Sequence, residues 1–253
     1  MVSDARSFSW HLVAQSLTRP YRVTIPMVLL VAMVPFYIFI PELWPPKISY
    51  TPELALDRAL PLIPAWSLVY GALYLFLILL PIFVIRQDDL IRRTVYAYLL
   101  IWITAYVFFV IYPTWAPRPL EVTGDGFAVW GLLALYSTDP PYNCFPSLHV
   151  AHSFVSALAS YRVHRNLGIL AMIVAALVAL STLFTKQHYV VDVIAGVILA
   201  YAAYFIFLRG YARERLPALD REVAPALAVC IVGVVAAGVA AYWVVYLVFP
   251  RNP

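Results

Sequence analysis

The chain has 253 residues, of which 64% are hydrophobic and 12% are charged, and its formal net charge is +4. Soluble domains carry roughly 45–50% apolar and about 25% charged residues, so this composition excludes a soluble globule, a disordered chain and a disulfide scaffold. It predicts an integral membrane protein. The basic residues form no aromatic-laced patch, and nucleic acid is therefore not expected as a partner.

Seven apolar segments, each continuous rather than alternating, predict an all-α, polytopic membrane helical bundle. They are residues 23–40, 65–85, 94–112, 145–161, 167–185, 189–208 and 224–249. About 20 helical residues cross the hydrocarbon core of a bilayer, so the fourth segment is short for a span. It also carries polar groups, and we expect it to pack inside the bundle.

The distribution of positive charge predicts the orientation of these spans. With this segmentation, 12 of the 17 Lys and Arg residues fall on the side of the N-terminus, which the positive-inside rule assigns to the cytoplasm. The C-terminus and the long, Pro- and aromatic-rich loops at 41–64 and 113–144 then lie on the outer face. Cys144 lies in a loop and Cys230 in the last span, near opposite faces, so no disulfide between them is expected.

Three regions follow from this segmentation. Residues 1–22 form a cytoplasmic N-terminal segment, in which 8–21 either lies along the interface as an amphipathic helix or is a frayed terminus. Residues 23–208 form a six-span membrane domain that contains every candidate catalytic residue. Residues 209–253 supply a cytoplasmic loop and a seventh span.

The first candidate site residue is Arg118, within Ala-Pro-Arg-Pro in the second long outer loop. The flanking prolines restrict its backbone, and a guanidinium held in this way can bind a phosphate through paired hydrogen bonds. An arginine that anchors the loop at the headgroup level fits the same residues.

The sequence Phe-Pro-Ser-Leu-His opens the fourth apolar segment at residues 145–149. Pro146 suits the first turn of a helix, where unpaired backbone N–H groups and the positive end of the helix dipole favour an anion. Ser147 could donate its hydroxyl to that anion, and His149 follows about one turn into the helix. A helix start with one hydrogen-bonded histidine explains the same pattern.

His188 and Asp192 lie four residues apart at the start of the sixth segment, so they share one helix face. A carboxylate that accepts the imidazole N–H fixes the tautomer and leaves the other nitrogen as a nucleophile or base. A purely structural His–Asp contact at a helix end would show the same spacing.

Together these motifs place two histidines, a carboxylate, an arginine, a serine and a helix N-terminus on the outer face. This set suits phosphoryl transfer through a phosphohistidine: one imidazole attacks phosphorus, the second protonates the leaving alkoxide, and fixed positive groups hold the phosphoryl oxygens. Zinc binding by the two histidines and the Asp is less favourable, because Arg118 and Lys186 would repel a cation. No metal is therefore expected.

The three motifs resemble the signature of the type 2 phosphatidic acid phosphatase superfamily, which reads Lys-x6-Arg-Pro, Pro-Ser-Gly-His and Ser-Arg-x5-His-x3-Asp. The chain has Arg-Pro at 118–119, Pro-Ser-Leu-His at 146–149 and Ser-Thr-x5-His-x3-Asp at 181–192. Order and spacing agree, and the resemblance extends over roughly residues 60–208. It implies a six-helix core, to which the last predicted span would be an addition.

The resemblance also implies a role for each motif residue. His188 would be the nucleophile that becomes phosphorylated, Asp192 its orienting partner, and His149 the acid for the leaving group and then the base for the acceptor. Arg118 and Ser147 would hold the phosphoryl oxygens. No metal or organic cofactor is implied.

Three positions depart from the signature: Ile111 stands at the first-motif Lys, Leu148 at the Gly and Thr182 at the Arg. Two phosphate-binding cations are therefore missing, and we expect Lys186 to replace one of them. The motifs Phe-Pro-Ser-Leu-His and His-Tyr-x-x-Asp also resemble the inositol phosphorylceramide synthase branch. This second resemblance implies a lipid phosphotransferase.

The expected function is that of an integral-membrane enzyme that cleaves the phosphoryl group of a lipid phosphate ester, with water as acceptor in a lipid phosphate phosphatase. A lipid alcohol as acceptor would make it a phosphotransferase. A non-catalytic lipid-binding or transport protein of the same fold is the alternative from a different class. The sequence leaves the lipid donor, the acceptor and the oligomeric state open, and membrane lipids are expected partners in each case.

Overall fold

The structure is a computed structural model that describes residues 25–43, 48–119 and 121–250. The predicted interfacial helix at 8–21 lies outside these residues. The regular elements in the described part are all helices, joined by loops in which two isolated backbone bridges form. This confirms the all-α fold.

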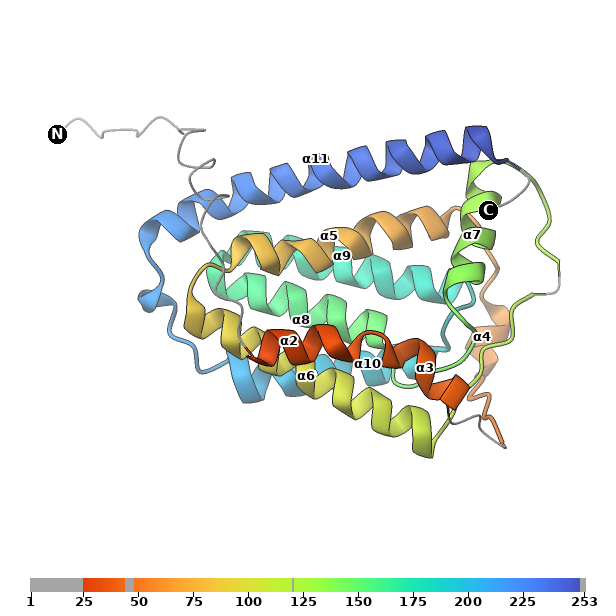
Figure 1. Cartoon of the computed structure of the whole chain (residues 1–253), viewed down its shortest axis with the longest axis horizontal. Coiled ribbons are helices and arrows are strands. Elements are labelled where there is room, and N and C mark those ends of the chain that lie inside the picture. Colours follow the sequence, from red (N-terminus) through yellow and green to blue (C-terminus); the bar gives the residue numbers. More distant parts are fainter. Residues whose placement is uncertain (1–24, 44–47, 120, 251–253) are drawn as a thin grey trace.

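Five of the described helices are long and apolar enough to cross a membrane. They are α5 (Trp66–Val84), α6 (Asp88–Ile111), α9 (Arg165–Phe184), α10 (Val190–Ala203) with its continuation η1 (Tyr204–Leu208), and α11 (Ala218–Val248). They run along the long axis of the molecule, and α11 forms one side of the bundle (Figure 1). The protein is therefore an integral-membrane helical bundle.

The other two predicted spans are shorter helices. The first divides into α2 (Ile25–Met33) and α3 (Phe36–Leu43), since Pro35 at the break has no backbone N–H to continue the helical hydrogen bonds. The second is α8 (Leu148–Val163), which packs against α5, α6, α9 and α10. Its mostly buried side chains confirm that this segment lies inside the bundle.

The loops at one end of the bundle contain two helices that the sequence analysis does not predict. These are α4 (Ala55–Ala59), before α5, and α7 (Phe127–Thr138), which lies across the end of the bundle (Figure 1). The 12 residues of α7 are too few to span a membrane. Phe127 of α7 lies 4.7 Å from Trp243 of α11, ring centroid to ring centroid, so the last helix braces this end.

The last helix also begins earlier than the sequence indicates. The predicted loop after residue 208 holds the short helix η2 (Arg213–Arg215) and the first turns of α11, which starts at Ala218 rather than at 224. Asp220, in the first turn of α11, accepts a hydrogen bond from the side chain of Gln87 just before α6. This polar contact explains why the helix extends beyond its apolar stretch.

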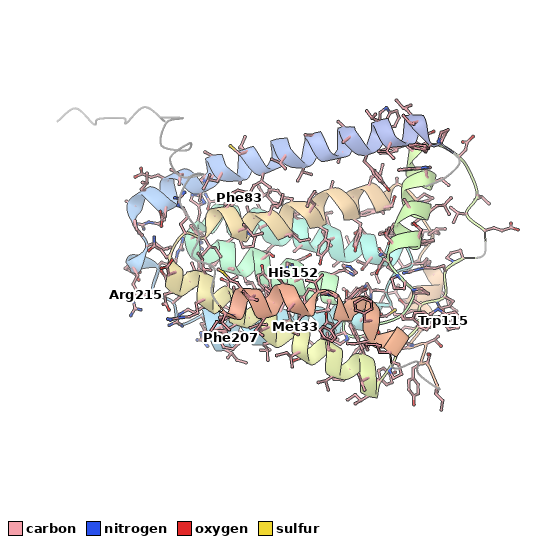
Figure 2. All side chains as sticks on the ribbon, in the orientation of Figure 1. Met33, Phe83, Trp115, His152, Phe207 and Arg215 are labelled. Atoms are coloured by element: carbon pink, nitrogen blue, oxygen red, sulfur yellow. The ribbon has the colours of Figure 1, made fainter. Side chains whose placement is uncertain are left out.

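The surface and the interior of the bundle differ in side-chain size. Large apolar side chains cover the outward faces of the long helices and project from them all around the bundle (Figure 2). The interior face of α8 carries small residues, which let neighbouring helices approach closely. The buried small residues are Ala151, Ser153, Ser156, Ala157, Ala159 and Ser160.

Gly196 marks a close approach of α10 to the start of α8. A Cβ atom at this position would lie 2.7 Å from the carbonyl oxygen of Ser147 and 3.1 Å from Cβ of Val150. Since Cβ atoms do not approach other atoms so closely, only glycine lets the first turn of α8 rest directly on α10.

We expect Gly196→Ala to lower the melting temperature of the purified protein in detergent. Overpacking of this kind typically costs about 1–3 kcal/mol, which exceeds the gain of about 1 kcal/mol in helix propensity. Gly238→Ala is the matched control, because α11 leaves open space around that position. A Gly196→Ala protein as stable as the control would contradict this packing of α8 on α10.

Candidate active site

The six predicted site residues converge at the end of the bundle where α8 and α10 begin. Ser147 is the N-cap of α8, and its Oγ accepts a hydrogen bond from the Val150 N–H at 3.3 Å. Pro146 therefore precedes the cap, whereas the sequence predicted it in the first turn; the helix begins one residue after Ser147, at Leu148. Ser147 is completely buried, and its hydroxyl donates to no acceptor among the described residues.

Asp192 ties the starts of the two helices together. Its backbone carbonyl accepts a hydrogen bond from the Ser147 N–H at 3.1 Å. Its Oδ2 accepts a hydrogen bond from the Tyr189 N–H at 2.9 Å, which caps α10. The same Oδ2 lies 3.5 Å from Nδ1 of His188. The carboxylate therefore caps α10 and also faces the imidazole, at a distance longer than a normal N–H···O hydrogen bond.

The two histidines face each other across the start of α8. Nδ1 of His149 lies 3.3 Å from Nε2 of His188, and the rings are inclined by 64°. His188 thus presents Nδ1 to Asp192 and Nε2 to His149. At 3.3 Å no phosphoryl group fits between the two nitrogens, so the rings must part for one to enter; site geometries of this kind commonly change when substrate binds.

Tyrosines surround the His149 imidazole, and the sequence analysis does not identify them. The ring of His149 makes edge contacts with Tyr70 and Tyr74 of α5, at centroid distances of 5.3 and 5.1 Å. Tyr37 of α3 makes a third edge contact at 6.1 Å. These rings therefore form an aromatic wall next to the imidazole. They were not predictable from local spacing, because they come from other helices.

Arg118 is held at the site by contacts with three residues, one in the loop before α10 and two at the end of α7. Its Nη1 donates to the backbone carbonyl of Lys186 at 2.7 Å, and its Nη2 donates to the carbonyl of Asp139 at 3.3 Å. The guanidinium also lies over the ring of Tyr136, 4.9 Å from the centroid. Its buried Nε has no hydrogen-bond partner in the described structure. Arg118 is therefore fixed near His188 with its buried Nε donor unused.

Lys186 lies in the loop between α9 and α10 with a left-handed backbone, φ 56°. Its Nζ donates to the backbone carbonyls of Asp57 and Leu60, at 2.9 and 2.6 Å. The lysine thus holds the α4 segment against the site. It also borders the same pocket as Arg118 and His188.

That pocket has a volume of about 510 Å³. Besides Arg118, Lys186 and His188, its walls include a third cation, Arg58, and the acids Glu53 and Asp57. Arg58 forms an exposed ion pair with Glu53 at 3.2 Å. The pocket therefore joins the imidazole to a set of positive groups, as an anionic substrate would require.

Asp57 is a buried residue that the sequence analysis does not single out. Its Oδ1 accepts a hydrogen bond from the Val190 N–H, and its Oδ2 accepts one from the Leu54 N–H, both at 2.8 Å. One carboxylate therefore joins the first turn of α10 to the loop before α5. The two segments lie more than 120 residues apart, and no motif connects them.

A second acidic residue, Asp139 at the end of α7, fixes the loop between α9 and α10. Its carboxylate accepts hydrogen bonds from the Tyr37 hydroxyl, at 3.0 Å, and from the Gln187 side-chain amide. Gln187 in turn accepts a hydrogen bond from the Thr185 hydroxyl at 2.9 Å. This network places a negative charge next to Arg118, 4.0 Å from its Nη2.

The positions that depart from the family signature fall into different environments. Thr182 is buried, and its carbonyl accepts the N–H groups of Gln187 and His188 at 2.9 and 3.2 Å. Leu148 is buried in the first turn of α8, whereas Ile111 is exposed at the end of α6. Thr182 thus shapes the His188 loop through its backbone.

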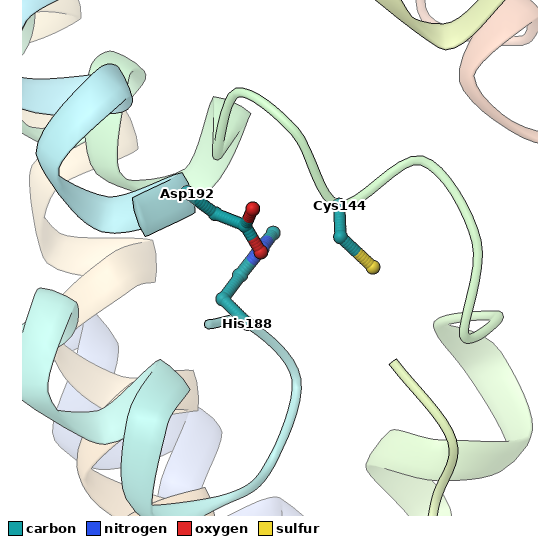
Figure 3. A group of neighbouring side chains, drawn as sticks. All are labelled: Cys144, His188 and Asp192. Atoms are coloured by element: carbon teal, nitrogen blue, oxygen red, sulfur yellow. The ribbon is translucent and has the colours of Figure 1, made fainter. Parts of the chain in front are cut away.

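Cys144 lies closer to these residues than the sequence indicates. Its thiol comes within 4.8 Å of ligand atoms of both His188 and Asp192, although the sequence placed it simply in a loop (Figure 3). Both cysteines are unpaired, and Cys144 is buried. Burial, and next the Asp192 carboxylate, raise the pKa of the Cys144 thiol above its usual value.

This raised pKa predicts the pH dependence of Cys144 alkylation. Because the thiolate is the reactive form, we expect the rate with iodoacetamide to rise about tenfold per pH unit through pH 9 without levelling. An ordinary thiol, with a pKa of about 8.5, levels off near that pH. Mass spectrometry of the Cys230→Ala protein would follow this single thiol, and a plateau below pH 9 would contradict the burial of Cys144.

Parts of the chain are similar to known proteins. A 55-residue stretch of the chain, 22% of its length, is 38% identical to a PA-phosphatase related-family protein of Dictyostelium discoideum. A stretch of 67 residues, 26% of the chain, is 40% identical to an uncharacterized protein of Methanocaldococcus jannaschii. The matches span only 10% and 27% of those two proteins, and no solved structure matches the chain. The model of the PAP2 superfamily matches residues 49–206, more than half of the chain, which therefore belongs to that superfamily.

Proposed function

We propose that this protein is a metal-independent lipid phosphate phosphatase that works through a phosphohistidine at His188. The supporting observation is the position of His188 between Asp192 and His149, with one imidazole nitrogen facing each. Asp192 would hold the proton on Nδ1, which leaves the lone pair of Nε2 available as the nucleophile.

In the first step, Nε2 of His188 would attack the phosphorus of a lipid phosphate ester. A P–N bond forms and the P–O bond to the lipid breaks, while protonated His149 gives its proton to the leaving alkoxide. Arg118, Ser147 and Lys186 would hold the non-bridging oxygens, whose charge is greatest during transfer. The unused Nε of Arg118 and the Ser147 hydroxyl proton are donors suited to this purpose.

In the second step, His149 would act as a base. It takes a proton from water while the water oxygen attacks the phosphorus, the P–N bond breaks and inorganic phosphate leaves. A lipid alcohol in place of water would give a phosphotransferase, as the likeness of two motifs to the inositol phosphorylceramide synthase branch suggests. The same residues would serve both reactions, so the acceptor alone distinguishes them.

We also propose that the site lies on the outer face of the membrane, with the N-terminus in the cytoplasm. Trp115, near the site, and Arg215, in the loop before α11, lie at opposite ends of the bundle (Figure 2). The Arg215 end carries most of the arginines, which the positive-inside rule assigns to the cytoplasm.

We expect purified protein in detergent to release phosphate from a panel of lipid phosphates, with or without a chelator. His188→Ala should abolish this release, because no other group supplies the attacking nitrogen. In wild type, acid-labile phosphate bound to protein should accumulate on rapid quenching, and it should be absent from the variant.

His164→Asn is the matched control for this experiment. His164 caps α9 at the other end of the bundle through its Nδ1, and Asn can supply a similar acceptor. Unaltered turnover in His188→Ala would falsify the phosphohistidine mechanism and favour a non-catalytic role. Product that forms only when a lipid alcohol is added would identify a phosphotransferase.

Lys186→Met tests the replacement of a missing family cation. We expect a loss of at least tenfold in kcat/KM, since the variant removes both a positive charge from the pocket and two hydrogen bonds to the α4 segment. Lys186→Arg should retain more activity than Lys186→Met if charge is what matters. Unimpaired phosphate release by Lys186→Met would exclude a role for this lysine in phosphate binding.

A further inference from the structure

Three potential metal ligands of different chemistry meet at the start of α10. The Cys144 thiol, an imidazole nitrogen of His188 and a carboxylate oxygen of Asp192 lie within 4.8 Å of one another, and all three residues are buried. Figure 3 shows the carboxylate next to the imidazole, with the cysteine across from them. Cys144 comes from the loop before α8, so the cluster joins two segments of the chain.

Two polar atoms of these residues lack hydrogen-bond partners. Oδ1 of Asp192 is buried and accepts no hydrogen bond in the described structure. Nδ1 of His188 likewise has no hydrogen bond there, because the 3.5 Å to Asp192 Oδ2 exceeds a normal N–H···O distance. The thiol makes one weak contact, with the Pro141 carbonyl at 3.4 Å. Buried polar atoms left in this way are costly, and a bound cation would satisfy them.

We propose that Cys144, His188 and Asp192 form an inhibitory site for Zn²⁺. Sulfur, nitrogen and oxygen are the three ligand types that zinc takes in proteins, and Mg²⁺ or Ca²⁺ would reject the sulfur. In a tetrahedral zinc site neighbouring ligand atoms lie about 3.3–3.8 Å apart. The ligand atoms of the cluster lie up to 4.8 Å apart, about 1 Å more than this. Rotation of the Cys144 side chain toward the imidazole, with loss of its contact to the Pro141 carbonyl, would close that gap.

Two nearby cations oppose a metal ion in the cluster, and two ligand charges favour it. From the sequence, Arg118 and Lys186 were expected to repel a metal ion. In the structure the Arg118 guanidinium donates to two backbone carbonyls and the Lys186 ammonium donates to two others. On binding, the Cys144 S–H bond breaks, its proton leaves to solvent and an S–Zn bond forms. The thiolate and the Asp192 carboxylate then neutralise both charges of the ion.

The effect on the reaction follows from the tautomer and rests on the proposed function. Zinc would bind Nδ1 of His188, the nitrogen that faces Asp192. A neutral imidazole that gives its Nδ1 lone pair to a metal carries its proton on Nε2. The attacking nitrogen would then have no lone pair, and phosphoryl transfer would stop until the ion left.

Cobalt binding tests the site without any substrate. Co²⁺ titrated into wild-type protein in detergent should produce a thiolate-to-cobalt charge-transfer band, which added Zn²⁺ should remove. The band should be missing in Cys144→Ser, which keeps nearly the same shape but cannot supply the thiolate. It should persist in the matched control Cys230→Ser, which alters the half-buried cysteine of α11.

The activity assay provides the second readout. Zn²⁺ should inhibit phosphate release by wild type, and the inhibition constant should rise by more than about tenfold in Cys144→Ser, since a ligand is lost. A charge-transfer band in Cys144→Ser, or its absence in folded wild type, would overturn the zinc site. Absence of phosphate release would count against the proposed function alone, because the cobalt band is read without turnover.

Discussion

The backbone N–H of Ser147 donates to the backbone carbonyl of Asp192, and the remaining site geometry depends on this contact between two helix starts. It requires α8 to lie directly on α10, which is possible because Gly196 has no side chain. Once the two starts are joined, His149 one turn into α8 must lie near His188 just before α10. The geometry of the candidate site is therefore a consequence of close packing between a short, small-residue helix and its neighbour.

The loop that carries His188 is fixed by polar contacts. Asp57 and Lys186 join it to the segment before α5, while Asp139 and Gln187 join it to the segment after α7. These contacts lie at the end of the bundle, and each buried donor or acceptor that they satisfy would be costly to leave unpaired. Helix α11, outside the matched family region, supports this arrangement indirectly through its aromatic packing on α7.

The sequence predicted those features that depend on local spacing. The four-residue interval predicted that His188 and Asp192 lie side by side, and the short, polar fourth segment predicted that α8 is buried. Asp57, Asp139 and Cys144 could not be predicted in this way, because each lies in a segment between the long helices whose position depends on the packing of distant parts of the chain. The tyrosines around His149 could not be predicted for a related reason. In a chain with 18 tyrosines, composition does not indicate which rings lie inside the helical bundle.

The same carboxylate makes His188 suitable for two kinds of chemistry. Asp192 can hold a proton on Nδ1, which directs the lone pair of Nε2 toward a phosphorus atom. If a metal replaces that proton, the tautomer reverses and the lone pair of Nε2 is lost. In the two proposals above, the Cys144 thiol, as the third residue of the cluster, would decide which state forms. A non-ligating side chain at position 144 would preserve the proton-holding geometry and remove the competing one, so residue 144 would control metal sensitivity without taking part in phosphoryl transfer.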